Sequence, residues 1–288
     1  MTRSARPVPL IISAVPTPFD DRLQLDRDAF VELLERLPDD HADVLVAGTT
    51  GEFPALDRAE RDQLVDLAVA VLGPDRVVAH VGAGSLFESL RLAEHAAAAG
   101  VRRVALLTPY YLPADDRQVI DHAHSFAAAH PELAVFPYLF PDRTGVEVGA
   151  ATFRALMEPV NVAGAKLSGR ANDDFAAFVA VLRPDQALYT GDDSRLPGIR
   201  ADGGAGVVSG CFAVVPDLML HHRDDPDRIR HLVELLGPSI ARQKFALQTL
   251  TGRPWRSRMS MPELPAGVAA EIVELVEQSR RLAPVAGS

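Results

Sequence analysis

Lys166 has the side chain best suited to covalent chemistry in this sequence. It follows the apolar residues 162–165, so its stem is expected to enter the protein interior where a buried strand ends. An apolar pocket disfavours a charged ammonium and lowers the pKa of a lysine, which frees the amine to attack a carbonyl carbon. The alternative is a lysine whose ammonium reaches solvent or pairs with a carboxylate.

Lysine is scarce in this chain, and its scarcity favours the first interpretation. Lys166 and Lys244 are the only lysines among 29 basic residues, and all the others are arginines. Arginine cannot be deprotonated in a protein, whereas lysine can become a neutral nucleophile. Lys244 lies in a helical pattern and is predicted to lie at the surface or at a subunit interface. We therefore expect the covalent chemistry at Lys166.

Tyr138 and Arg143 follow the apolar run that precedes the run of Lys166. Tyr138 ends residues 133–138, and Arg143 lies in the turn of residues 141–145. A phenol beside the amine could move protons, and the planar guanidinium is the side chain best shaped to bind a carboxylate. The structural alternatives are a core aromatic for Tyr138 and a surface turn residue for Arg143.

Two threonines between glycines follow an earlier apolar run, in the order Gly48-Thr49-Thr50-Gly51. Their hydroxyls and the exposed backbone N–H groups could hold a carboxylate close to a helix N-terminus. The same residues suit a tight turn from strand to helix, in which the threonines cap the helix. Both interpretations stay open at this point.

The sequence predicts neither a metal site nor a cofactor site. Asp192 and Asp193 also follow an apolar run, but no cluster of histidines or glutamates accompanies them, and a helix cap explains them better. The nine histidines form no ligand set, and no glycine pattern indicates a dinucleotide site. The glycines within residues 203–206 leave a phosphorylated ligand as a minor alternative.

Short apolar runs alternate with helical patterns along most of the chain. Apolar strands separated by helices are typical of parallel strands buried on both faces, and eight of them predict an α/β fold, a closed (β/α)8 TIM barrel. The carboxyl ends of barrel strands build the active site, so the side chains named above should converge on one rim with Tyr110-Tyr111. The predicted strands are residues 9–15, 43–47, 76–81, 103–107, 133–138, 162–167, 187–189 and 206–209, and the predicted helices are residues 28–37, 58–72, 87–99, 117–130, 153–157 and 174–182.

The last quarter of the chain shows helical patterns only, ending with an amphipathic run over residues 263–282. We therefore expect a barrel over residues 1–215 and a C-terminal helical region over residues 216–288. The stretch of residues 191–204 is short for a helix between the last two strands.

Composition argues against several classes of partner and location. The net charge of −10 and the pI near 5.4 speak against nucleic acid and against an anionic membrane. The single cysteine, Cys211, excludes an internal disulfide. No apolar stretch approaches the ~20 residues that span a bilayer, and no secretory signal is recognisable, so we expect a cytoplasmic protein.

Taken together, the motifs resemble the dihydrodipicolinate synthase and N-acetylneuraminate lyase family. The resemblance implies a barrel with C-terminal helices and a Schiff-base lyase or aldolase acting on pyruvate or another small 2-keto acid together with an aldehyde. It also implies a homotetramer built from two dimers, or a homodimer, and no metal or organic cofactor, because the lysine itself does the covalent work. The resemblance covers residues 8–250 and rests on the motifs at residues 48–52, 108–111, 138–145, 164–166 and 191–193.

The resemblance implies roles for Lys166, for Tyr138 and for the threonine turn. Lys166 matches the Schiff-base lysine, and Tyr138 matches the proton relay. Thr49 and Thr50 match the pair that relays protons and binds the carboxylate of the keto acid, with Gly48 beside them in the same substrate-binding turn.

Three further residues take their roles from the resemblance. Tyr111 matches the tyrosine that reaches the site of a neighbouring subunit to complete the relay. Arg143 matches the arginine with which synthases hold the carboxylate of the aldehyde substrate. Val208 occupies the place of the aliphatic residue that lines the pyruvate pocket.

The departures from the family pattern concern the second substrate. Leu139 stands where synthases often have asparagine, and Leu167 stands where many members carry an acidic residue. These changes leave the Schiff base intact. A sugar-acid aldolase or dehydratase of the same family is therefore an alternative, as is a keto-acid-binding homologue without turnover.

Overall fold

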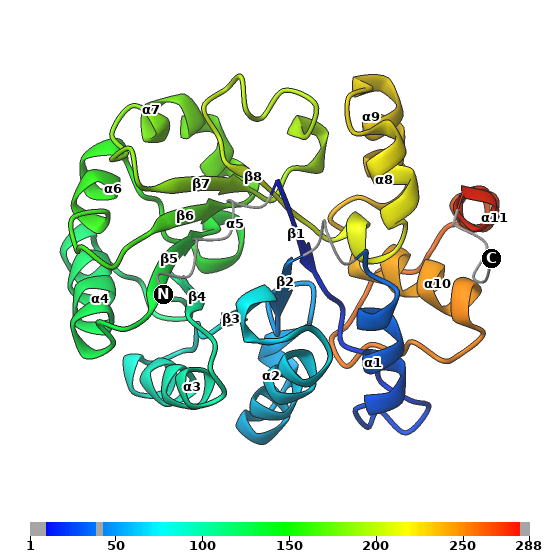
Figure 1. The fold of residues 1–288 in the computed structure, drawn as a ribbon, viewed down its shortest axis with the longest axis horizontal. Helices are drawn as coiled ribbons and strands as arrows, with labels where there is room; N and C mark the ends of the chain where they lie inside the picture. Colours follow the sequence, from blue (N-terminus) through cyan, green and yellow to red (C-terminus); the bar gives the residue numbers. More distant parts are fainter. Residues whose placement is uncertain (1–9, 39–42, 283–288) are drawn as a thin grey trace, which may run out of the picture.

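The computed structural model describes residues 10–38 and 43–282, and its strands form a closed barrel (Figure 1). Every strand pairs in parallel with the next one along the chain, and β8 closes the barrel on β1 by pairing Val208 with Ile12. The predicted (β/α)8 TIM barrel is confirmed. The strands are β1 (Ile11–Ala14), β2 (Asp43–Val46), β3 (Val77–His80), β4 (Arg103–Leu107), β5 (Ala134–Leu139), β6 (Gly164–Leu167), β7 (Ala187–Thr190) and β8 (Gly206–Ser209).

The apolar runs predicted these strands closely, and two of them, β4 and β8, have the predicted bounds. Pro9, the predicted start of the first strand, lies outside the described residues. The agreement follows from composition: the strands are rich in β-branched and aliphatic residues that suit a position between an inner and an outer apolar layer.

Three of the helices around the strands begin where polar side chains satisfy free N–H groups of their first turn. Asp57 and Glu60 form a capping box at α2, Asp115 and Gln118 form another at α4, and Ser85 caps α3. The helices that surround the strands are α1 (Arg27–Glu35), α2 (Arg58–Leu72), α3 (Leu86–Ala98), α4 (Asp116–Ala129), α5 (Pro141–Thr144), α6 (Ala150–Leu156) and α7 (Phe175–Val179).

The connection between β7 and β8 carries no α-helix, as the short stretch predicted. A 3₁₀ helix, Asp193–Arg195, begins it, and Asp192 caps this helix by accepting from the Ser194 N–H. Helix α9 (Pro226–Leu236), from further along the chain, packs against this segment and covers the barrel there.

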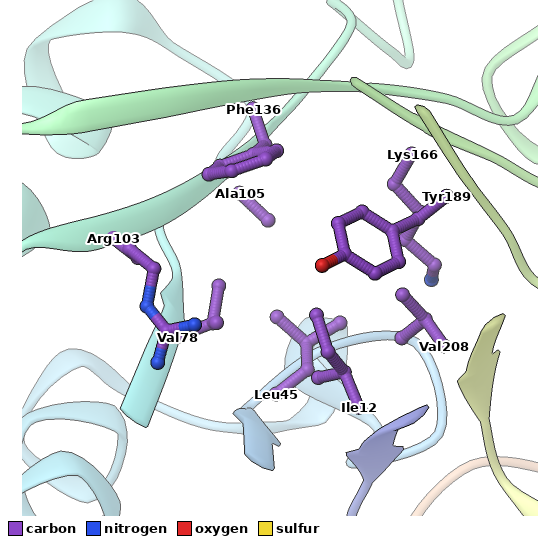
Figure 2. A pocket seen from close by; sticks show the side chains of 9 residues that line it. All are labelled: Ile12, Leu45, Val78, Arg103, Ala105, Phe136, Lys166, Tyr189 and Val208. Carbon is purple, nitrogen blue, oxygen red and sulfur yellow. The ribbon is translucent and has the colours of Figure 1, made fainter. Parts of the chain in front are cut away.

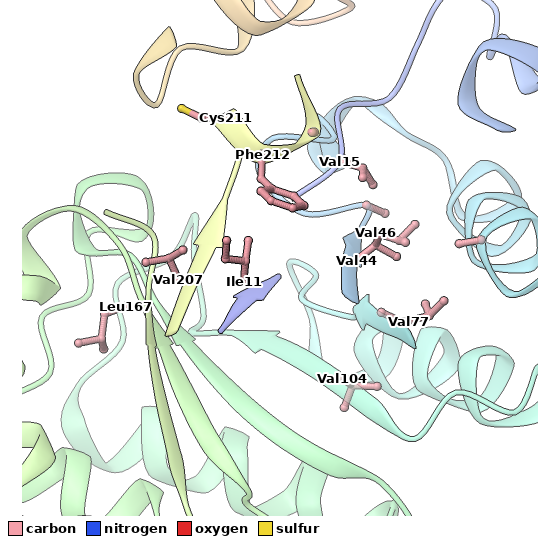
Figure 3. Packing of buried hydrophobic residues seen from close by; sticks show 14 of the residues in the cluster. Ile11, Val15, Val44, Val46, Val77, Val104, Leu167, Val207, Cys211 and Phe212 are labelled. Carbon is pink, nitrogen blue, oxygen red and sulfur yellow. The ribbon is translucent and has the colours of Figure 1, made fainter. Parts of the chain in front are cut away.

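Side chains alternate between the barrel interior and the layer under the helices, as strand geometry requires. Ile11, Val104 and Val207 face outward into the main core between strands and helices (Figure 3). Ile12, Val208 and their counterparts on the other strands fill the interior. Because Lys166, Tyr138 and His80 follow inward-facing positions by two residues, all three point into the barrel near its carboxyl end.

Helices follow β8, as predicted, and the four α-helices among the described residues gather on one side of the barrel beside α1 (Figure 1). The division of the chain at residue 215 stays a prediction. Within the described ranges, no helix combines the length and the apolar character needed to cross a membrane. Besides α9, these helices are α8 (Pro216–His222), α10 (Ile240–Thr251) and α11 (Ala266–Leu282).

Candidate active site

Lys166 lies at the carboxyl end of β6 with its side chain inside the barrel. It is only 7% exposed, and its Nζ lies 3.7 Å from the centre of the Tyr138 ring. The two residues are direct partners in the pairing of β5 with β6, which explains their contact. Among the described residues, no carboxylate forms an ion pair with Lys166, so the surface ion-pair alternative does not apply.

The hydroxyl of Tyr138 joins three strand ends of the barrel. It lies 3.2 Å from Thr49 Oγ1 and donates to Ser168 Oγ at 3.4 Å. Burial raises the pKa of the phenol, but the nearby Lys166 charge and the hydrogen bonds to Ser168 and Thr49 outweigh that effect and lower the pKa below its ordinary value. A buried phenol with a lowered pKa can give up and recover a proton beside the amine.

The turn that carries Thr49 and Thr50 is not a helix cap. The backbone of Glu52 donates to Thr49 O at 3.0 Å, and Thr17 Oγ1 donates to Gly51 O at 2.7 Å. The next α-helix, α2, is capped by Asp57, which overturns the capping alternative for the threonines. Their hydroxyls are therefore available to other partners, and that of Thr49 faces Tyr138.

Arg143 lies at the rim on the short helix α5 and is exposed. Its guanidinium carbon is 5.7 Å from the centre of the Phe140 ring, and Phe140 in turn stacks on Tyr138 with ring centres 6.0 Å apart. The ring of Phe140 therefore contacts both the guanidinium of Arg143 and the phenol ring of Tyr138.

The acidic neighbours of Arg143 pair with another arginine. Arg170 donates to Asp142 through both Nε (2.9 Å) and its backbone N–H (2.8 Å) and lies 3.0 Å from Glu147. Gly169 permits this contact, because a Cβ there would lie 1.8 Å from the Asp142 carboxylate and its φ is +58°. Within the described part of the chain, Arg143 has no carboxylate partner and is free to bind a ligand.

Val208 and Lys166 line a small apolar cavity inside the barrel (Figure 2). The cavity holds about 30 Å³, which is room for one or two small groups. In Figure 2 Lys166, Tyr189 and Val208 lie along one side of it, and Phe136 and Ala105 lie across from them. Beneath the lysine, the barrel therefore accepts only small, apolar parts of a ligand.

Tyr111 is not brought to Lys166 by the fold of a single chain. It is 92% exposed and adopts φ of +77°, a backbone conformation that is strained for a tyrosine. Gly48, by contrast, is buried at the start of the threonine turn. The predicted role of Tyr111 in the site of a neighbouring subunit stays a prediction.

His80 lines the site, although the sequence did not single it out. Its buried ring lies edge-on to Tyr138 with ring centres 6.1 Å apart, and Arg61 Nη2 lies 3.3 Å from its Nδ1. Because a guanidinium only donates, Nδ1 must accept and the proton lies on Nε2. Burial, followed by the charges of Arg61 and Lys166, lowers the pKa of His80 well below its ordinary value and keeps the ring neutral. Its position two residues after the inward-facing Val78 is the signal that could have found it.

The prediction for Lys244 was wrong. Lys244 is 2% exposed; its Nζ forms an ion pair with the buried Glu52 and donates to Arg256 O at 2.7 Å. Burial lowers the pKa of this lysine to about 8, against the opposing charge of Glu52. The helical pattern around Lys244 was real, but the face that carries the lysine packs inward.

The described residues contain no group of three histidine, cysteine or acidic side chains that could hold a metal ion. Asp192 acts as the cap that the sequence predicted, through its bonds to the backbone N–H and hydroxyl of Ser194 (3.0 and 2.6 Å). Asp193 is buried beside Cys211, and burial raises its pKa to about 6. The acidic pair thus has a structural explanation.

Comparison with known proteins agrees with this geometry. A sequence model of the "Dihydrodipicolinate synthetase family" matches residues 8–222. The 4-hydroxy-tetrahydrodipicolinate synthase of a Synechococcus species is 33% identical over 210 residues, covering 72% of this chain and 70% of the relative. The enzyme of that name from Heliobacterium modesticaldum is 36% identical over 202 residues, covering 69% and 67%.

Solved structures share the whole fold. Dihydrodipicolinate synthase from Aquifex aeolicus has a TM-score of 0.80 at 26% identity, covering 96% of this chain and 99% of that one. A sialic acid aldolase from Ruminococcus gnavus has a TM-score of 0.82 at 19% identity, covering 94% and 96%, and shows the fold alone. The similarity extends through the C-terminal helices as well as the barrel.

Proposed function

The chain belongs to the dihydrodipicolinate synthetase family and is a lyase of that family, and from this premise we propose that Lys166 forms a Schiff base with pyruvate or another small 2-keto acid. The observation that carries the proposal is the position of Lys166 Nζ, 3.7 Å from the ring centre of Tyr138. The lysine has no acidic partner among the described residues, and the phenol is hydrogen bonded to Thr49.

The covalent step uses the amine and the phenol together. The nitrogen of Lys166 attacks the keto carbon, and a proton moves from that nitrogen to the keto oxygen to give a neutral carbinolamine. Tyr138 passes a second proton to that hydroxyl, which leaves as water, so that a protonated imine remains. The imine draws electrons from the neighbouring carbon, which can then lose a proton to form an enamine or break its carbon–carbon bond.

The threonine turn is the proposed seat of the keto acid's carboxylate. Thr49, Thr50 and the backbone N–H groups that follow Gly48 are donors that suit a carboxylate. Val208 and the apolar cavity beneath Lys166 suit the methyl group of pyruvate, because a small apolar space accepts no charged group. A short 2-keto acid would thus place its carboxylate at the polar threonine turn and its methyl group in the apolar cavity.

Tyr111 is proposed to complete the proton relay in a neighbouring subunit. Its exposed, strained position suits a residue whose partner lies on another chain, because strain at a non-glycine residue is kept where surrounding structure demands it. A homotetramer made of two dimers, or a homodimer, would provide that partner.

The second substrate is proposed to carry an acid group. Arg143 lies exposed at the rim with its acidic neighbours held by Arg170, and the planar guanidinium can bind a carboxylate with two parallel hydrogen bonds. The partner of the keto acid would be an aldehyde acid, as in a synthase, or a sugar acid, as in an aldolase or dehydratase.

Reductive trapping tests the proposed function. Protein incubated with pyruvate and borohydride should gain the mass of one reduced pyruvate adduct per chain. Turnover of pyruvate with a panel of acidic and neutral aldehydes and of sugar acids then identifies the partner. Trapping without turnover of any partner would indicate a keto-acid-binding homologue, and no adduct with any small 2-keto acid would refute the Schiff base.

A further inference from the structure

The turn that carries Thr49 is strained at both of its ends. Ala47 and Glu52 adopt φ of +53° and +55°, in the left-handed region that residues with a Cβ rarely occupy. Such strain persists only where the surrounding structure over-determines it, and it clusters at functional sites. The contacts of Glu52 identify what holds the turn.

The carboxylate of Glu52 is fully buried and receives donors from the C-terminal part of the chain. Its Oε1 accepts from Lys244 Nζ, and its Oε2 accepts from the backbone N–H groups of Arg258 (3.0 Å) and Met259 (2.8 Å). Lys244 also donates to Arg256 O at 2.7 Å, which fixes its own position. Three donors therefore hold one carboxylate from one side.

Arg258 attaches the same C-terminal segment on the far side of the turn. Its guanidinium donates to both oxygens of Glu60 at 2.6 Å and to Ala55 O at 3.0 Å. Lys244 and Arg258 also both lie over the ring of Phe19, at 4.6 and 4.3 Å from its centre. The segment and the turn thus form one packed unit.

Two short contacts connect Glu52, through Thr49, to the hydroxyl of Tyr138. Glu52 N–H donates to Thr49 O at 3.0 Å, and Thr49 Oγ1 lies 3.2 Å from the hydroxyl of Tyr138. A buried ion pair is by itself weak evidence for stability, because apolar replacements of such pairs are often neutral or stabilising. Its place behind a strained turn that faces the site indicates a positional role instead.

We propose that Glu52 and Lys244 are positioning residues that hold Thr49 against Tyr138. The inference rests on the proposed function, since Thr49 matters only if Tyr138 moves protons. Without the pair, the turn relaxes, Thr49 moves away from the phenol, and proton transfer at the carbinolamine slows. Binding of pyruvate through the amine of Lys166 remains.

A double-mutant cycle between Lys244→Met and Thr49→Val tests the proposal. The readout is the single-turnover rate at which pyruvate forms a borohydride-trappable adduct. Lys244→Met should slow this rate about 10-fold in the wild-type background but no more than about 2-fold in the Thr49→Val background, because coupled residues are not additive. If Lys244→Met does not fold, Lys244→Met/Glu52→Gln, which leaves no unpaired buried charge, takes its place in the cycle.

Two further variants separate position from general stability. Lys244→Gln keeps a donor toward Glu52 and should recover part of the rate. Arg253→Gln breaks an ion pair of the same segment, to the exposed Glu32 at 2.9 Å, and should leave the rate unchanged. Additive losses in the cycle would overturn the positioning role while wild-type trapping at Lys166 still stood. Loss of wild-type trapping would instead remove the proposed function itself.

Discussion

Lys166 and Lys244 are both buried, and each places its nitrogen over an aromatic ring, Tyr138 at 3.7 Å and Phe19 at 4.6 Å. Their surroundings differ in the nearest acceptors. Lys244 donates to a carboxylate and to a backbone carbonyl, which together accept two of its three ammonium hydrogens. Lys166 meets a phenol and a small apolar cavity, with no carboxylate among the described residues.

If Lys166 is the nucleophile, as proposed, the comparison implies that burial alone does not make a lysine reactive. A carboxylate beside a buried ammonium favours the charged form and opposes the effect of burial on its pKa, as Glu52 does for Lys244. A phenol can accept and return a proton, and the neutral amine can then react. The partner of the lysine therefore decides between a structural and a chemical role.

The residue that carries the pyruvate adduct is the strongest test of this difference between the two lysines. Peptide mapping after borohydride reduction should place the adduct on Lys166 and leave Lys244 unlabelled, because Lys244 is held by Glu52. Lys166→Arg should abolish the adduct, since a guanidinium cannot become a neutral amine, while the circular dichroism spectrum stays that of the folded protein.

An adduct on Lys244 in wild-type protein would reverse the two assignments. Labelling of Lys244 in Glu52→Gln but not in the wild type would show that the carboxylate of Glu52 keeps Lys244 unreactive.

Removal of the phenol tests the second difference between the two environments. Tyr138→Phe keeps the ring beneath Lys166 and removes the hydroxyl, so packing should survive. Turnover should fall by roughly 10²-fold or more if the phenol moves protons in a slow step. Phe19→Leu is the matched change beside Lys244 and should affect thermal stability rather than turnover. Full activity of Tyr138→Phe would make Tyr138 a core aromatic.

The rim arginine should give a smaller and more selective effect. Arg143→Ala should lower kcat/KM about 10–150-fold for acidic partner substrates and leave neutral ones unaffected, because a charged hydrogen-bonded pair contributes ~1.5–3 kcal/mol. Arg154→Ala, at an exposed position of the nearby helix α6, serves as the control. Equal losses for acidic and neutral partners would indicate a structural role of Arg143 in its turn.

The pH dependence of stability tests the environment of Lys244. Burial lowers its folded-state pKa to about 8, below the ordinary 10.5, so between these values the unfolded chain binds more protons than the folded one. Stability from this group therefore rises as the pH increases from about 8 to about 10. The Tm of the wild type should gain about 2 °C or more relative to Lys244→Met over this range. A relative loss would mean that the attraction of Glu52 outweighs burial.

The sequence was sufficient to predict the barrel and the neighbourhood of Lys166. Strands β5 and β6 are consecutive, so a residue at the end of each had to lie beside the other, and Tyr138 does pair with Lys166. Apolar runs and their spacing along the chain are sufficient to predict contacts between neighbouring strands. The catalytic roles assigned to these residues stay predictions.

The burial of Lys244 could not be predicted in the same way. Its partner Glu52 lies 192 residues away, and a helical pattern alone does not show which face meets a buried carboxylate. The position of His80 could have been found from Val78, but its neutral state could not, because that state depends on burial and on the charge of Arg61 from another element. Contacts between distant segments decide both cases, and local patterns carry no record of them.

The attachment of Glu52 to the C-terminal segment also affects when the protein becomes complete during synthesis. The ribosome delivers β2 and its turn early, long before Lys244 and Arg258 have been added. The contacts of Glu52 with Lys244 and Arg258 can form only after α10 and the segment behind it have emerged. A nascent chain that has already assembled its eight strands would therefore still lack the support of its threonine turn. The last fifth of the chain thus holds a turn whose neighbours in the proposed site, Tyr138 and Lys166, lie in the first three fifths.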